Sequence, residues 1–244
     1  MSDVRSDTVT YSAGGITLRG HLARPAAASA KRAGVLVVHE WWGLNDYIRR
    51  RADMLAELGY TALAVDMYGN GQTATDPGGA GKLMNGVLGD RAGLEARLRA
   101  GYELLKQQDG VASDKIAAIG YCFGGAAVLH AARIGAPLAA VVSFHGALGS
   151  FHKPKPGEVK AKVLVCHGAA DSLVPDADLE AFKKEMTEAK ADFQVKAYPG
   201  ALHGFTNPQA TENGKKYGLP LAYDADADRQ SWDDMKALFA RTIG

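Results

Sequence analysis

The stretch IAAIGYCFGG at residues 116–125 decides the fold, because it joins two kinds of local structure at one cysteine. An apolar run typical of a buried strand ends here, and small residues typical of a packed helix begin. The spacing Gly120-x-Cys122-x-Gly124 matches a strand-turn-helix elbow in which cysteine replaces the usual serine. In the alternative interpretation, the glycines only let two elements pack closely. The rest of the chain decides between these two.

The residue types at this turn suit a nucleophile. A side chain on such a tight turn is held at a strain of about 1–3 kcal/mol, and glycines two residues before and after remove side chains that would clash. The helix that starts at Cys122 favours the thiolate through its dipole. The backbone N–H of Phe123 would point at a developing oxyanion. We therefore expect Cys122 to attack an electrophile, with the Phe123 N–H as a donor to the oxyanion.

Strands and helices alternate on both sides of the elbow. A polar and apolar alternation around Gly14-Gly15 predicts an antiparallel hairpin over 9–25. Further strands are expected over 34–40, 61–69, 115–121, 138–146, 161–168 and 193–200, and helices over 48–58, 83–107, 124–134, 176–189 and 224–242. This order predicts an α/β fold with a mostly parallel central sheet, helices on both faces and the hairpin at its N-terminal edge. No shift in composition divides the chain, so we expect a single domain over 1–244.

Composition excludes several classes of function. A net charge of +1 without a long basic run argues against nucleic acid as a partner. Two cysteines, Cys122 and Cys166, are too few for a disulfide scaffold. No apolar run approaches the roughly 20 residues that span a membrane, and the N-terminus has no apolar signal segment. We expect a cytoplasmic protein, the alternative being a secreted protein whose signal has been removed.

Two further loops carry the partners that a cysteine nucleophile needs. In an elbow fold the acid and then the histidine follow the nucleophile in chain order, each after a strand. Asp171 in HGAADSLVP and His203 in YPGALHGF fit that order. His203 would take and return the proton, and Asp171 would orient its imidazole. The alternatives are that Asp171 is a loop acid, with Asp176 and Asp178 as rivals, and that His203 is a loop histidine bonded to backbone.

The set HEWWGL, GYCFGG, HGAADSLVP and HGF resembles the dienelactone hydrolase family of α/β-hydrolases, from about residue 14 to the C-terminus. The resemblance implies an α/β-hydrolase fold and a Cys122–His203–Asp171 triad. It implies that this triad hydrolyses small esters or lactones through an acyl-thioester, without a cofactor. It also implies that Glu40 contacts the resting thiol and moves when substrate binds, and that Trp41 supplies a second oxyanion N–H. A pair between Glu40 and one of the arginines at 49–51 is the structural alternative.

The sequence departs from this family where the substrate would bind. Asn207 stands where dienelactone hydrolases place an arginine after the catalytic histidine, and the region 70–90 offers only Lys82 and Arg91 for a second one. A neutral ester therefore fits better than an anionic lactone. The candidates for substrate contact, each also interpretable as a structural residue, are Trp42, Tyr68, His145 and Asn207. The stretch 206–223 is expected to be a loop, either a lid or a solvated surface loop.

Three alternatives to an ester or lactone hydrolase remain. The same thiol could attack an uncharged phosphotriester. The chain could be a ligand sensor of hydrolase fold that no longer turns over. A peroxidatic role for Cys122 is disfavoured, because no resolving cysteine lies nearby in sequence. No metal-binding spacing occurs, so neither a metal nor another cofactor is expected. Both a monomer and a homodimer stay open.

Overall fold

The computed structural model of the chain describes residues 3–27 and 31–244. These residues form two compact units, the first ending at Ile119 and the second running from Gly120 to Gly244. The boundary falls near the end of strand β5 (Val111–Tyr121), just before Cys122. The expectation of a single domain stays a prediction.

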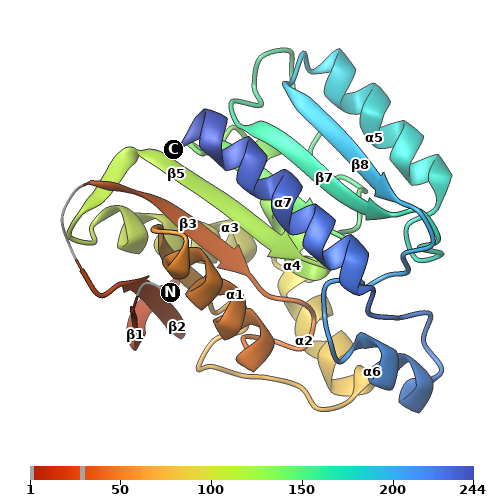
Figure 1. Ribbon diagram of the computed structural model, residues 1–244, viewed down its shortest axis with the longest axis horizontal. Helices are drawn as coiled ribbons and strands as arrows, with labels where there is room; N and C mark the ends of the chain where they lie inside the picture. Colours follow the sequence, from red (N-terminus) through yellow and green to blue (C-terminus); the bar gives the residue numbers. More distant parts are fainter. Residues whose placement is uncertain (1–2, 28–30) are drawn as a thin grey trace. The chain divides into compact units, whose positions relative to one another are not determined.

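The first unit begins with the expected hairpin (Figure 1). β1 (Val4–Ala13) and β2 (Ile16–Pro25) pair antiparallel along their whole length. Gly14 and Gly15 close the turn with φ angles of 55° and 79°, the left-handed values that a two-residue turn of this type requires. The hairpin expected over 9–25 is confirmed, and it begins earlier than the sequence pattern indicates.

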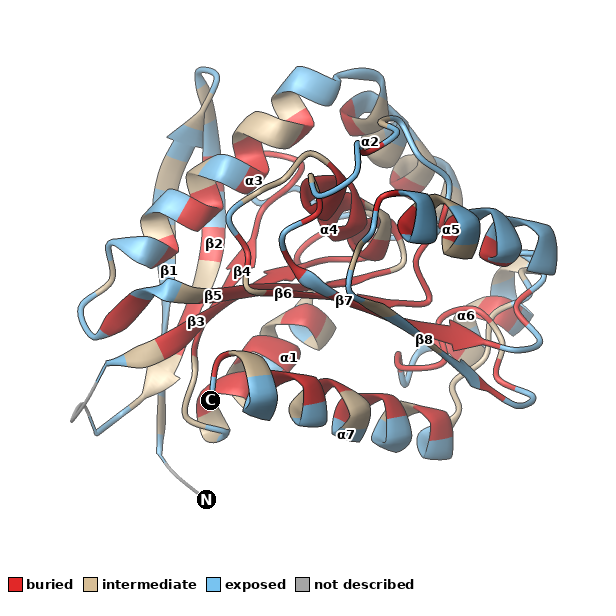
Figure 2. Cartoon of the chain, turned by 90° about the horizontal axis from the view of Figure 1, so that it is seen from above, coloured by how far each residue is buried: buried red, intermediate tan, exposed pale blue. Residues whose placement is uncertain are grey.

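The next strands of this unit pack between helices. β3 (Arg32–Val38) and β4 (Thr61–Val65) are parallel, and β4 also pairs antiparallel with β2. Figure 2 shows α1 (Asp46–Glu57) and α3 (Arg91–Lys106) on opposite faces of these strands. Every residue of β4 is buried, as expected for a strand that is covered on both faces.

The single helix expected over 83–107 is wrong, because the structure has two helices there. α2 (Pro77–Gly89) ends at Asp90, and α3 begins at the next residue. Asp90 Oδ1 accepts a hydrogen bond from the Gly93 N–H at 2.9 Å, so Asp90 is the N-cap of α3. Asp90 both ends α2 and caps α3. The apolar residues repeat with helical spacing on both sides of it, so the pattern does not reveal the boundary.

The second unit has three parallel strands, each hydrogen-bonded to the next: β6 (Ala140–Phe144), β7 (Lys162–Gly168) and β8 (Phe193–Tyr198). α4 (Phe123–Arg133) and α5 (Asp176–Glu188) lie on one face, and α7 (Ala225–Thr242) lies on the other (Figure 2). The carboxyl ends of these strands reach one edge, so the loops that follow them meet there. Parallel strands, an antiparallel hairpin and helices on both faces confirm the expected α/β class.

The expectation of a loop over 206–223 is wrong, because the segment contains helix α6 (Ala210–Tyr217). The helix ends at Gly218, whose φ of 65° is typical of a helix C-terminus. The returning chain then passes so close to Gly214 that a Cβ there would overlap the Leu221 carbonyl. This tight packing favours a fixed segment over a lid.

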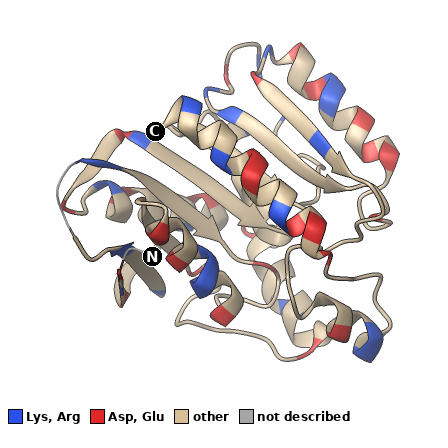
Figure 3. Ribbon diagram, viewed as in Figure 1, with Lys and Arg blue, Asp and Glu red and all other residues tan. Residues whose placement is uncertain are grey.

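Most charges of the second unit lie on its helices. Figure 3 shows both signs interspersed along α5 and α7. Several form exposed pairs one turn apart, such as Lys183 with Glu180 at 2.7 Å. Such pairs contribute about 0–1 kcal/mol each to stability. Within residues 3–27 and 31–244, no helix is both long and apolar enough to cross a bilayer.

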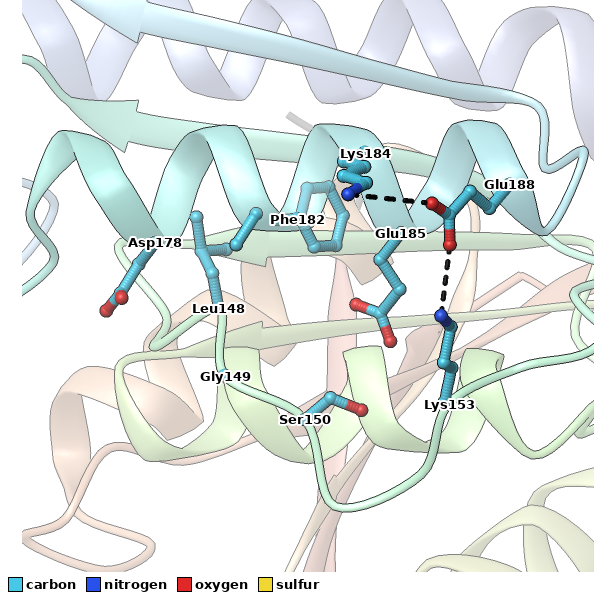
Figure 4. Close-up of a pocket in the computed structure, with 10 residues that line it drawn as sticks. Leu148, Gly149, Ser150, Lys153, Asp178, Phe182, Lys184, Glu185 and Glu188 are labelled. Atoms are coloured by element: carbon cyan, nitrogen blue, oxygen red, sulfur yellow. Dashed lines mark ion pairs between the residues drawn. The ribbon is translucent and has the colours of Figure 1, made fainter.

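Unlike the exposed charges on the helices, Arg133 is among the largest fully buried side chains. Its Nη2 donates to Glu185 Oε2 at 2.8 Å and to the Leu148 carbonyl at 2.7 Å. Figure 4 shows Glu185 at a surface pocket of about 380 Å³, which is lined by α5 and the loop 148–153 and by none of the expected triad residues. The Arg133–Glu185 pair therefore fixes the last turn of α4, the helix that begins after Cys122.

We predict that Glu185→Gln destabilises the fold by about 3–5 kcal/mol, because it leaves the buried Arg133 guanidinium without its carboxylate. The measurement is chemical unfolding followed by circular dichroism. The matched control is Glu180→Gln on the same helix, which removes the exposed pair with Lys183 and should change the free energy of unfolding by at most about 1 kcal/mol. Equal effects of the two substitutions would contradict the assignment of Arg133 as a buried anchor.

Candidate active site

Cys122 sits at the turn between β5 and α4 with a strained backbone. Its φ of 52° and ψ of −115° lie outside the regions that a side-chain-bearing residue prefers. Its N–H donates to the Phe144 carbonyl at the end of β6, at 3.0 Å. A Cβ at Gly120 would overlap the backbone of Gly124. The glycine before the turn is therefore needed for this geometry.

The three expected triad residues come together in the second unit. Each follows the carboxyl end of a strand, Cys122 after β5, Asp171 after β7 and His203 after β8. His203 Nε2 lies 3.2 Å from Cys122 Sγ, and His203 Nδ1 lies 2.8 Å from Asp171 Oδ2. The Nδ1–H donates to the carboxylate, which leaves Nε2 to exchange a proton with the sulfur. A thiol nucleophile, its base and an orienting acid would make these contacts. The catalytic roles of the three residues stay predictions.

The acid is held in place by its own loop. The Asp171 side chain is fully buried, and its Oδ1 accepts a hydrogen bond from the Leu173 N–H at 2.9 Å. The rival carboxylates Asp176 and Asp178 lie exposed in the first turn of α5. The geometry thus distinguishes Asp171 from its neighbours, a distinction that sequence order alone could not make.

The charge state of His203 follows from its neighbours. Burial by itself would lower the pKa of His203, but the charge on Cys122 and the hydrogen bond to Asp171 outweigh burial and raise the pKa to about 10. The imidazole therefore holds a second proton at neutral pH and loses it only as the pH rises through about 10. A protonated imidazole 3.2 Å from the sulfur stabilises negative charge there.

Phe123 opens α4 directly after Cys122, so its backbone N–H is one of the leading amides that have no acceptor within the helix. Its side chain is buried. The amide lies at the turn that carries the sulfur, which is where a donor to an oxyanion is expected. Its role in catalysis stays a prediction.

Two expected substrate contacts of this unit are almost fully buried. His145 is 1% exposed, and its Nε2 lies 2.7 Å from Thr206 Oγ1. Asn207 is 2% exposed, and its Oδ1 accepts a hydrogen bond from the Gln209 N–H at 2.9 Å. Contact of either side chain with substrate stays a prediction. Thr206 could not be expected from the sequence, because a threonine in a loop carries no distinguishing pattern.

The other expected site residues belong to the first unit. Glu40, Trp42 and Tyr68 are buried there, and Trp41 is partly exposed. The Tyr68 hydroxyl donates to the Trp41 carbonyl at 2.9 Å. Tyr68 therefore supports the backbone that carries the expected oxyanion donor. The roles of these four residues toward substrate stay predictions.

The backbone around Tyr68 is held by residues with no expected role. Asp66 Oδ1 accepts from the N–H groups of Tyr68 and Gly69, at 2.9 and 2.8 Å. His39 Nε2 accepts from the Met67 N–H at 3.1 Å, so its Nδ1–H donates to the Glu40 carbonyl at 2.6 Å. Burial lowers the pKa of His39 to about 4, so this ring is neutral. Asp66 therefore fixes the turn after β4, and His39 ties Glu40 to the same segment.

Several cationic side chains of the first unit were candidates to pair with Glu40 or to bind an anionic substrate. They are paired with other carboxylates or lie exposed. Arg49 and Arg50 lie within ion-pair distance of Asp46 and Glu57, at 3.7 and 2.5 Å. Lys82 and Arg91, the candidates for a second substrate-binding cation, are exposed side chains of α2 and α3. Across residues 3–27 and 31–244, no group of three or more His, Cys, Asp or Glu side chains is arranged to hold a metal ion.

Both the sequence and the fold of the chain are similar to those of known proteins. The model of the dienelactone hydrolase family matches residues 18–243. The chain belongs to this family. Its structure is similar to that of a dienelactone hydrolase-like promiscuous phosphotriesterase, P91, from metagenomic libraries, with 40% identity, a TM-score of 0.89 and 99% of each chain covered. A solved structure named m3DLH has 38% identity and a TM-score of 0.91, with 99% of both chains covered.

The similarity extends to proteins known by sequence. A protein of Aquifex aeolicus assigned as a carboxymethylenebutenolidase is 28% identical, with 92% of this chain and 94% of that protein covered. The resemblance noted in the sequence is therefore confirmed, and so is the α/β-hydrolase fold. This member of the dienelactone hydrolase family is a hydrolase of the ester and lactone class.

We predict that Cys122→Ala lowers the pKa of His203 by about 1–3 units, because it removes the nearby charge and leaves burial to act. The measurement is a titration of the His203 ring nitrogens by NMR. Cys166→Ala is the matched control, because Cys166 is a buried residue of β7 and should leave the titration unchanged. An unchanged pKa in Cys122→Ala would show that the sulfur does not set the charge of His203.

Proposed function

We propose that this hydrolase cleaves small neutral esters and lactones through a covalent acyl-thioester on Cys122. The observation that carries the proposal is the chain of contacts from Asp171 Oδ2 to His203 Nδ1 and from His203 Nε2 to Cys122 Sγ, at 2.8 and 3.2 Å. A thiol, a base and an orienting carboxylate in contact form a complete set for nucleophilic catalysis. A ligand sensor of the same fold would need none of these contacts.

In acylation, Cys122 Sγ attacks the carbonyl carbon and its electron pair forms the new C–S bond. The carbonyl oxygen takes the negative charge, which the Phe123 N–H stabilises. The family resemblance assigns a second such donor to the Trp41 N–H and a contact with the resting thiol to Glu40. As the tetrahedral intermediate collapses, His203 Nε2–H protonates the leaving alkoxide and the C–O bond breaks.

In deacylation, a water molecule attacks the thioester carbon while His203 Nε2 takes one of its protons. Collapse of this second intermediate releases the carboxylic acid and returns the sulfur to its resting state. Asp171 holds the Nδ1–H throughout and stabilises each cationic form of the ring.

The sequence expectations of a cytoplasmic enzyme that acts on a small molecule, without cofactor, nucleic acid or membrane partner, are part of this proposal.

The preference for a neutral substrate rests on Asn207. An asparagine stands where dienelactone hydrolases place the arginine that binds a substrate carboxylate, and its amide oxygen is bonded within its own turn. A neutral side chain provides no charge to offset the desolvation of an anionic substrate.

We predict that p-nitrophenyl butyrate is turned over continuously and that Cys122→Ala lowers kcat at least about 10³-fold, because the nucleophile is lost. The measurement is stopped-flow release of p-nitrophenolate, with Cys166→Ala as the matched control that retains wild-type turnover. Equal turnover by wild type and Cys122→Ala would contradict the triad. A burst of one equivalent followed by no release would instead identify a ligand sensor.

A second candidate activity is hydrolysis of uncharged phosphotriesters, and the 40% identity to a promiscuous phosphotriesterase favours it. Here Cys122 Sγ attacks phosphorus, an S–P bond forms and the aryloxide leaves. Water then cleaves the S–P bond and yields the phosphodiester. Cys122, His203 and Asp171 would have the same roles as in ester hydrolysis. The attack again places negative charge on an oxygen beside the sulfur, here the phosphoryl oxygen.

For this activity we predict slow turnover of diethyl p-nitrophenyl phosphate in the presence of a chelator, dependent on Cys122. The reason is that attack and release need no group beyond the thiol and its base. Steady release of p-nitrophenolate that disappears in Cys122→Ala is the expected result. Activity that survives in Cys122→Ala would contradict the shared site.

A further inference from the structure

We propose that His145 and Thr206 form a positioning pair that holds the imidazole of His203 in register with Cys122. The inference rests on the proposed function, because it concerns the base of that reaction. It gives His145 a role other than contact with substrate, and it gives a role to Thr206, which no sequence pattern indicates.

The end of β6 supports the turn that carries Cys122. The Phe144 carbonyl, on the last residue of this strand, accepts the N–H of Cys122 at 3.0 Å. His145 is the next residue, and its own N–H donates to the Cys166 carbonyl on β7 at 2.8 Å. The backbone that leads into the His145 side chain is therefore fixed to the same strand end as the nucleophile.

The side chain of His145 reaches from that strand end to the loop that carries His203. His145 Nε2 lies 2.7 Å from Thr206 Oγ1, three residues beyond His203. Its ring packs edge-to-face against the ring of His203, with centroids 5.2 Å apart and planes at 66°. It packs in the same way against Phe205, at 5.3 Å and 78°. His145 and Thr206 are both buried, so water does not compete for their hydrogen bond.

The contacts of this loop fix the backbone of His203 but do not by themselves fix the tilt of its ring. The carbonyls of His203 and Phe205 accept N–H groups of Ala222 and Asp224, at 3.3 and 3.0 Å, so the backbone is tied to the returning chain. The hydrogen bond to Asp171 fixes the His203 ring at Nδ1 alone. The tilt of the ring, which decides where Nε2 lies, is limited by the His145 ring packed against it.

The backbone of His145 supports a functional interpretation. Its φ of 41° is in the left-handed region, which costs free energy for any residue with a Cβ. A glycine would adopt this conformation without that cost. Strain of this kind persists where surrounding contacts enforce it, and it clusters at active sites. The hydrogen bond to Thr206 needs a ring nitrogen, and the packing against His203 and Phe205 needs an aromatic ring. A glycine would supply neither.

The test compares two substitutions of Thr206, one that removes the hydroxyl but keeps the volume of the side chain and one that keeps the hydroxyl. Thr206→Val keeps the shape and removes the hydrogen bond to His145. We expect kcat for p-nitrophenyl butyrate to fall about 10-fold or more, because a small misplacement of a catalytic group has a large effect on rate. KM should stay within about twofold. Thr206→Ser, which keeps the hydroxyl, should restore kcat.

A double-substitution cycle tests whether the two residues act as a unit. His145→Phe keeps an aromatic ring beside His203 and removes the Nε2 partner of Thr206. Combined with Thr206→Val, it should lower kcat no further than the more severe single substitution. If Thr206→Val does not fold, as judged by circular dichroism, Thr206→Ala replaces it in both comparisons. Multiplicative losses in the double variant, or a wild-type kcat in the valine or alanine variant, would overturn the inference.

Failure of the positioning pair can be distinguished from failure of the proposed function. If Cys122→Ala turns over ester as fast as wild type, the triad itself is wrong. If turnover needs Cys122 but is unaffected by Thr206→Val, only the positioning pair is wrong. His21→Gln, which removes a pair with Asp53 in the first unit, is the control for loss of a histidine contact and should leave kcat unchanged.

Discussion

The geometry of this site depends on the strained backbone of Cys122. A φ of 52° at a residue with a side chain is costly, and it is held by the bond from the Cys122 N–H to the Phe144 carbonyl and by glycines that leave room for the turn. This conformation ends β5 and starts α4 at the sulfur. It places the sulfur against His203 at 3.2 Å. Because the strand end, the helix start and the sulfur that faces His203 share one residue, relaxing that turn would displace all three.

The sequence predicted the parts of the site that have a strict local requirement. Gly120 was predictable because the turn excludes a Cβ, and the order of Cys122, Asp171 and His203 was predictable because each must follow a parallel strand at one edge. The hairpin at Gly14-Gly15 was equally predictable, since its turn needs two left-handed residues. Each of these features depends on a few neighbouring residues, and this is why periodicity and spacing reveal them.

Features that depend on contacts between distant residues were not predictable. The contact of His145 with Thr206 joins residues that no spacing connects, and burial of Arg133 depends on Glu185, far along the chain. Asp90 was missed for a different reason: its contact with Gly93 is local, but the apolar period that continues past it gives no sign that a helix begins there. The helix α6 was missed because its sequence, ATENGKKY, is mostly polar and its close packing at Gly214 involves the later residue Leu221.

The charge of His203 connects this geometry to both halves of the proposed reaction. Its neighbours Cys122 and Asp171 raise the pKa of His203 to about 10 against the effect of burial, so in the proposed reaction the ring begins as the acid that the departing alkoxide needs. Acylation then removes the charge on the sulfur, and with it one cause of the raised pKa. Burial, which lowers the pKa, then acts more strongly, and the ring that has just given up its proton remains neutral. A neutral Nε2 is the base that the incoming water requires, so formation of the thioester itself converts His203 from acid to base.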